Sequence, residues 1–150
     1  MCIVIFSKKA YEQIVNCVKS ADNEYEVGGV LIGYRLVNLF FVIGVTLSKN
    51  KANASKTTFV LDGELHTDKA VKIIEKYRIH PQVIGSWHSP ILDDGNLSEQ
   101  DRASNRLMAS LLNGTLCTIV TMHDKIRFNT YYITKKNCVF ICLNARSMMI

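Results

Sequence analysis

The stretch IGSWHSPILDDGNLSEQD, residues 84–101, carries histidine, serine and aspartate side chains between a strand-like segment and the start of a helix. The strand-like run ends near His88, and an acidic loop that contains a glycine follows it. Ser98 and Asp101 have the spacing of a capping box, which predicts the N-terminus of a helix. Histidine, serine and aspartate at this density are typical of a metal or hydrolytic site, but also of an ordinary capped loop. Whether a site forms depends on partners elsewhere in the chain.

The segments around this stretch alternate between strand and helix patterns. Short apolar runs bounded by polar or glycine-containing turns predict strands, and apolar residues three and four positions apart predict helices. The alternation predicts an α/β fold in one domain covering 1–150, with a mixed β-sheet flanked by about three helices. The expected strands cover 2–6, 26–34, 39–47, 57–60, 82–87, 116–122, 126–133 and 138–143, the expected helices cover 8–21, 62–77 and 98–112, and a polar loop covers 48–56.

The third expected helix has an apolar stripe of its own. Ala103, Leu107, Met108 and Leu111 recur at helical spacing. Residues at this spacing lie on one side of a helix. We therefore expect this stripe to face the core and the opposite side of the helix to face solvent.

Composition and charge limit the possible functions. At 150 residues, 48% hydrophobic and 21% charged, the chain has the composition of a globular domain. No apolar run approaches the roughly 18 residues of a membrane span, and the apolar N-terminus MCIVIF lacks the basic region of a signal peptide. The five cysteines lack CxxC spacing, which favours free thiols in the cytoplasm. The net charge of +5 permits nucleic acid or acidic partners, but the lysines are scattered without interleaved aromatics, so nucleic acid is not the favoured partner.

A glutamate far upstream completes a pattern with this histidine, serine and aspartate. Glu26 begins the run EVGGVLIGY, whose interior glycines indicate close backbone approach or a bulge. One residue separates His88 from Pro90, seven more lead to Ser98, and two more lead to Asp101. This order resembles the JAMM (also JAB or MPN) metallo-isopeptidases. These carry a glutamate on an early strand, then His-x-His, seven residues, serine, two residues and aspartate.

The resemblance implies a fold, a chemistry and a class of partner. It spans 1–133, is closest to the bacterial stand-alone branch, and implies a cytidine-deaminase-like mixed sheet. The implied reaction is zinc-dependent amide hydrolysis, with His88 and Asp101 as zinc ligands. Glu26 would be the general base, and Ser98 would stabilise the oxyanion. The implied substrates are ubiquitin-like proteins joined through a C-terminal glycine tail to an amine, with the tail bound as an added strand.

Pro90 departs from this pattern, because the family has its second histidine ligand there. Proline has no side-chain donor, and positions 88 and 90 of a strand point to the same side. Zinc affinity should therefore fall, unless Asp93 or Asp94 supplies a carboxylate. Three functions stay open: a protein with weakened or lost catalysis that binds a ubiquitin-like protein or its conjugate, an active zinc-dependent isopeptidase, and a basic module that binds nucleic acid.

The resemblance also predicts where the candidate side chains lie. Four residues are expected to converge in one groove: Glu26, His88, Ser98 and Asp101. Glu26 and His88 on opposite faces of the domain would contradict the assignment. Trp87, the only tryptophan, is expected to be a packing anchor beside the site, with substrate contact as its alternative role.

Overall fold

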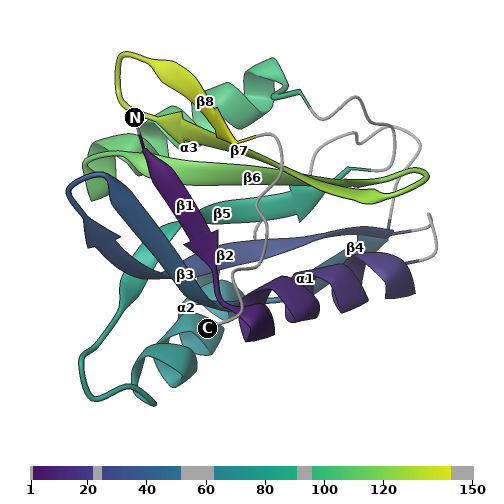
Figure 1. The fold of residues 1–150 in the computed structure, drawn as a ribbon, viewed down its shortest axis with the longest axis horizontal. Coiled ribbons are helices and arrows are strands. Elements are labelled where there is room, and N and C mark those ends of the chain that lie inside the picture. The colour runs from purple at the N-terminus through teal and green to yellow at the C-terminus, as the bar shows by residue number, and fades with distance from the viewer. Residues whose placement is uncertain (1, 22–24, 52–62, 91–95, 143–150) are drawn as a thin grey trace.

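Eight strands form one mixed sheet that carries three helices, which confirms the predicted α/β class (Figure 1). The structure is a computed structural model, and it describes residues 2–21, 25–51, 63–90 and 96–142. The strands are β1 (Ile3–Phe6), β2 (Tyr25–Leu36), β3 (Leu39–Val45), β4 (Ser48–Lys51), β5 (Gln82–Ser89), β6 (Thr115–Met122), β7 (Ile126–Ile133) and β8 (Cys138–Cys142), and the helices are α1 (Lys8–Ser20), α2 (Gly63–Ile74) and α3 (Glu99–Leu112).

The long strand β2 organises the sheet. The strand order is β1-β3-β2-β5-β6-β7-β8, and β4 pairs with the N-terminal part of β2. The pairs β1/β3 and β5/β6 are parallel, and the other pairs are antiparallel. In the β2/β5 pair, Gly28 lies opposite His88. The upstream and downstream halves of the candidate site therefore meet at the centre of the sheet.

The helices divide between the two faces of the sheet, with α1 in front and α2 and α3 behind in Figure 1. Apolar residues of α1 pack with Trp87 in one core cluster. On the other face, Ala70 of α2 and Ala109 of α3 belong to two smaller clusters. Successive side chains of a strand point to opposite faces. Trp87 therefore faces α1, while His88 faces the side that carries α3.

Segment 48–56 was predicted to be a polar loop, and that prediction is wrong for its first part. Residues 48–51 form β4, which pairs through its backbone with β2. A polar sequence can form such a strand because backbone pairing needs no apolar side chain, and edge strands commonly carry lysine. The strand predicted at 57–60 lies outside the described residues.

The second helix is shorter than predicted. It was expected to run to residue 77, whereas α2 ends at Ile74. After it, Lys76 and Tyr77 donate backbone hydrogen bonds three residues back, to Ile73 and Ile74. This tighter pattern is typical of the end of an α-helix.

In the part of the chain that the structure describes, no helix combines the length and the apolar character needed to cross a bilayer.

The predicted inner face of α3 is also wrong for most of its residues. The buried positions are Asn105 and Ala109, with Asp101 partly buried one turn earlier. These positions are four residues apart and share one side of the helix. The contacts of Asp101 at the first turn, described below, set this rotation. Of the four residues expected to pack inward, only Met108 is partly buried. The other three are exposed: Ala103, Leu107 and Leu111.

Candidate functional site

Glu26 and His88 project from the same face of the sheet. Gly28 pairs with His88 across β2 and β5, and Glu26 is two positions before Gly28 on β2. Residues two apart on a strand share a face. The Glu26 side chain is only 5% exposed. Glu26 and His88 therefore do not lie on opposite faces of the sheet, which would have contradicted the assignment.

Glycine holds β2 tightly against its neighbours, as the sequence predicted. A Cβ atom added at Gly29 would lie 1.9 Å from the backbone oxygen of Thr46. A Cβ atom at Gly33 would lie 1.9 Å from the backbone oxygen of Phe41, and the β2/β3 register shifts beside Gly33. Both the close approach and the bulge are therefore present in this strand.

Asp101 joins the start of α3 to the end of β5. The Ser98 hydroxyl accepts a hydrogen bond from the Asp101 backbone N–H at 3.0 Å, and Asp101 Oδ2 accepts one from the Ser98 backbone N–H at 3.0 Å. This confirms the predicted capping box. The other carboxylate oxygen, Oδ1, lies 3.6 Å from Nε2 of His88. One carboxylate therefore serves both the helix cap and the contact with His88.

The charge of Asp101 also affects the pKa of the buried Glu26 carboxyl. Burial raises the pKa of Glu26 above 4.5, and the negative charge of Asp101 raises it further. A carboxyl with a raised pKa holds a proton closer to neutral pH, which is the property of a general base that later acts as an acid. The structure thus brings Glu26, His88 and Asp101 together, and Ser98 joins them through the cap.

A second pair of polar side chains fastens α3 to β5 one helical turn further on. Asn105 Nδ2 donates to the backbone oxygen of Asp101 at 2.8 Å, and the Ser86 hydroxyl donates to Asn105 Oδ1 at 3.4 Å. Both side chains are buried. A buried polar side chain without these partners would cost about 1–3 kcal/mol. The pair therefore fixes where Asp101 sits relative to His88.

Sequence reasoning missed both of these residues. Asn105 lies four residues after Asp101, and Ser86 lies two residues before His88. Each therefore shares a face with a predicted site residue, by helical and strand periodicity respectively. That periodicity was the signal that could have found them.

The thiol of Cys117 lies next to Ser86 and Asn105 and stays protonated. Burial raises its pKa to about 12, the charge of Asp101 adds to the shift, and hydrogen bonds with Ser86 and Asn105 oppose it. The reactive and metal-binding form of cysteine is the thiolate. Cys117 therefore stays a protonated packing residue.

Neither the indole of Trp87 nor the ring of Pro90 supplies a polar group to the site. The Trp87 indole is 1% exposed, and its Nε1–H donates to the backbone oxygen of Thr46 at 3.0 Å. It has almost no surface that a substrate could reach, so its position fits the packing role. Pro90 is partly buried directly after β5. Two predicted substitutes for a missing ligand, Asp93 and Asp94, lie outside the described residues.

The described side chains do not complete a catalytic zinc site. His88 and Asp101 supply one nitrogen and one oxygen donor of kinds that zinc accepts. Within 2–21, 25–51, 63–90 and 96–142, no three side chains of His, Cys, Asp or Glu are grouped so that they could hold a metal ion. Catalytic zinc sites use three protein ligands and leave the fourth position to water or substrate. Among the described residues, the donor set therefore falls one ligand short of such a site.

Comparison with known proteins shows the fold and nothing finer. No family model matches the chain, and no curated protein matches it. The fold is shared by 124 chains of solved structures, so it is a known one. Among them is the solution structure of protein DSY2949 from Desulfitobacterium hafniense, with a TM-score of 0.70, 18% identity, and coverage of 98% of this chain and 95% of that chain.

Proposed function

We propose that this chain is a JAMM/MPN-type domain with an incomplete metal site. In this proposal it binds the C-terminal tail of a ubiquitin-like protein or its conjugate, and its catalysis is weakened or lost. The observation that carries the proposal is the contact between His88 and Asp101, 3.6 Å apart, beside the buried Glu26. Two segments far apart in sequence, one around Glu26 and the other containing His88 and Asp101, thus carry the residue types of the family motif and lie side by side, which supports the proposal.

The missing ligand is the reason to propose binding rather than hydrolysis. Without a third ligand at Pro90, bound zinc would be held weakly, and a weakly held ion is a poor activator of water. Glu26 and Ser98 would then contribute to the shape and polarity of a binding site. The proposed place of action is the cytoplasm, a compartment that suits cysteines outside disulfides, as are Cys2, Cys17, Cys117 and Cys138.

An active zinc-dependent isopeptidase is the second candidate. The raised pKa of Glu26 favours it, because that property is useful chiefly for proton transfer. This candidate needs a third zinc ligand from outside the described residues. It predicts one firmly bound zinc ion per chain, whereas the first candidate predicts much less.

The test uses ubiquitin and a ubiquitin fusion joined through the C-terminal glycine to a fluorescent amine. Under the first candidate, wild-type protein binds ubiquitin with amide chemical-shift changes around β2, β4 and β5, and it releases no fluorescence. Release of the amine by wild-type protein, abolished by a chelator and by Glu26→Gln, would establish the second candidate instead. Absence of both binding and cleavage would overturn the proposal.

A Pro90→His variant provides the matched comparison. If the remaining site is that of the family, restoring the histidine raises zinc affinity on the order of a hundredfold and creates cleavage of the fusion. A folded Pro90→His variant that gains neither zinc nor activity would show that the resemblance does not extend to the chemistry of the site.

A further inference from the structure

Four chain segments and the start of β1 lie together at the end of the sheet opposite the candidate site. The β2–β3 turn lies there because Leu36 pairs with Leu39, and the start of β5 lies there because Gln82 pairs with Gly33. The end of α3 and the β7–β8 turn join them, since Thr115 at the start of β6 pairs with the last residue of β7. In Figure 1 these turns stand together at the left edge of the sheet, and the tip of β5 that carries His88 points away from them. We call this region the distal end.

Exposed apolar side chains concentrate at the distal end. Eight large apolar side chains are exposed in the part of the chain that the structure describes, and five of them lie here. Val37 at the β2–β3 turn is 93% exposed, and Leu111 at the end of α3 is 79% exposed. Scattered apolar residues are normal on a surface, but a cluster marks a binding surface. The five are Ile3, Leu36, Val37, Ile79 and Leu111.

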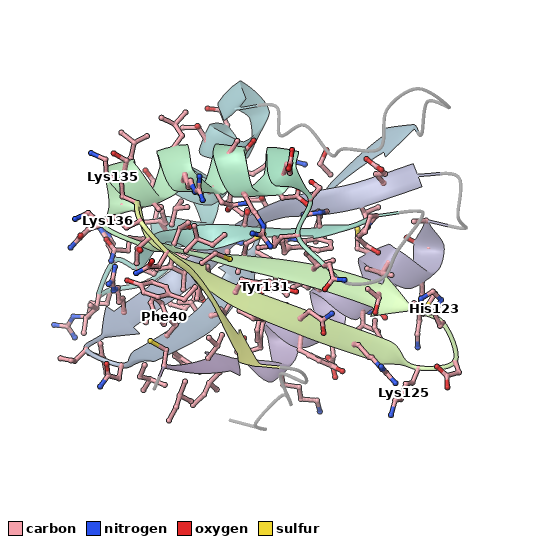
Figure 2. The ribbon with its side chains drawn as sticks, turned by 90° about the horizontal axis from the view of Figure 1, so that it is seen from above. Phe40, His123, Lys125, Tyr131, Lys135 and Lys136 are labelled. Carbon is pink, nitrogen blue, oxygen red and sulfur yellow. The ribbon has the colours of Figure 1, made fainter. Side chains whose placement is uncertain are left out.

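Basic residues lie in the chain segments of the distal end. The segments 34–39, 75–82, 111–115 and 133–138 contain five basic residues and one acidic residue, Glu75. This region therefore carries most of the chain's net charge of +5. Figure 2 shows two of the basic residues at this end, and His123 and Lys125 at the opposite end. The basic residues are Arg35, Lys76, Arg78, Lys135 and Lys136.

A pocket of about 230 Å³ opens between α3 and the sheet at the distal end. Apolar side chains of Phe40, Val83 and Leu111 line it, together with the guanidinium-bearing Arg35 and the amide-bearing Gln82. A pocket with a mixed polar and apolar lining can receive one bulky side chain of a partner and fix its orientation through the polar groups.

Arg35 is held in place at the wall of this pocket. Its guanidinium donates to the backbone oxygen of Asn113 and, at 2.7 Å, to the hydroxyl of Tyr132. It also lies 5.3 Å from the ring centre of Phe40 and 5.5 Å from that of Tyr132. A guanidinium has five N–H donors, so donors remain beyond these two bonds. A side chain that is already ordered loses little further entropy when it binds a carboxylate.

We propose that the distal end is a second binding surface, for an acidic protein segment that carries one bulky apolar side chain. The apolar side chain occupies the pocket beside Leu111, and the carboxylates of the segment face Arg35, Lys135 and Lys136. The pocket favours a peptide over a lipid surface, because a bilayer offers no single side chain to fill a concavity. This surface lies at the other end of β5 from His88, so the proposal does not depend on the proposed function.

The test is a titration of ¹⁵N-labelled protein with a synthetic peptide of glutamates around a single central phenylalanine. The expected amide shifts concentrate at Arg35, at 111–114 and at 135–137. Two control peptides replace the phenylalanine with glycine and the glutamates with lysine. The first binds more weakly because the pocket stays empty, and the second does not bind because its charge is reversed.

Protein variants locate the binding surface. The double variant Lys135→Glu/Lys136→Glu and the single variant Leu111→Ser change exposed side chains. Each is expected to weaken peptide binding by about tenfold. The matched control Lys125→Glu changes an exposed lysine in the β6–β7 turn and is expected to leave binding unchanged.

Four outcomes would overturn the proposal. The first is no peptide binding, and the second is an equal loss of binding in Lys125→Glu, which would mean attraction by net charge alone. The third is preference for vesicles containing phosphatidylserine or for a single-stranded oligonucleotide, with the same variants sensitive. The fourth is a concentration-dependent dimer in sedimentation that Leu111→Ser abolishes, which would make the occupant a second copy of this chain.

Discussion

The polar and charged side chains at the two ends of strand β5 differ in burial. At the His88 end, ionisable side chains are buried or partly buried, and Asp101 approaches His88 to 3.6 Å. At the Gln82 end, charges are exposed and lie among exposed apolar residues such as Leu111. Burying charges is costly even when they are paired, so a buried cluster needs a reason other than stability. The first end is the one for which we propose chemistry, and the second is the one for which we propose contact with a partner.

The largest expected effect is on the strand that supports the His88 end. Gly29→Ala would place a Cβ 1.9 Å from a backbone oxygen, which cannot move as a flexible side chain could. We expect a loss of about 3 kcal/mol or more in the free energy of unfolding, measured by urea denaturation. Gly44→Ala is the control, because its Cβ would meet the γ2 methyl of Ile73 at 2.9 Å, and a side-chain atom can shift at lower cost than a backbone oxygen. Equal effects for the two variants would show that β2 is not held by this backbone contact.

Substitution should affect stability much more at the buried polar contact than at the exposed apolar residue. Asn105→Ala leaves the Asp101 carbonyl and the Ser86 hydroxyl without this partner, so we expect a loss of about 1–3 kcal/mol in urea denaturation. Leu111→Ser, on the exposed side of α3, should change stability by about 0.5 kcal/mol or less. A larger loss for Leu111→Ser would reverse our assignment of the inner and outer faces of α3.

Removing the helix cap should have an intermediate effect. Ser98→Ala deletes the acceptor of the Asp101 backbone N–H, and we expect a loss of about 1 kcal/mol in the free energy of unfolding. The conservative Ser98→Thr keeps the acceptor and should retain most of the stability. If alanine and threonine at this position gave the same stability, the capping box would have no energetic role.

The smallest expected effect depends on pH and concerns Glu26. Because its folded pKa is raised above 4.5, its ionised form destabilises the folded state at pH values above the folded pKa. As the pH falls through the folded pKa towards 4.5, this destabilisation disappears, since the folded state takes up a proton before the unfolded state does. Glu26→Gln should therefore raise the free energy of unfolding near pH 7, and the gain should vanish at acid pH. A gain that is constant across this pH range would mean that ionisation of Glu26 is not its cause.

The sequence predicted the fold class and most elements, because strands and helices leave local signals in the spacing of apolar residues. It failed at β4, whose polar residues carry no such signal and whose strand forms by pairing with β2. It also failed on the inner face of α3. There, the apolar spacing of Leu107 and Leu111 was outweighed by the polar contacts of Asp101 and Asn105 with β5.

The candidate site could be anticipated only in part. The motif spacing brought Glu26, His88 and Asp101 into one hypothesis, and the sheet register places them together. The contact between Asn105 and Ser86 and the whole distal end depend on which strands become neighbours. Strand order and helix placement are long-range properties. Local periodicity could therefore mark Ser86 and Asn105 as sharing a face with site residues, but it could not predict their contact or the distal end.

Measurement of bound zinc in the purified protein tests the central claim most directly. The account predicts far less than one zinc ion per wild-type chain after dialysis, and close to one per chain in Pro90→His under the same conditions. One tightly bound zinc ion per wild-type chain, lost in both His88→Ala and Asp101→Ala, would contradict the claim that Pro90 leaves the site incomplete.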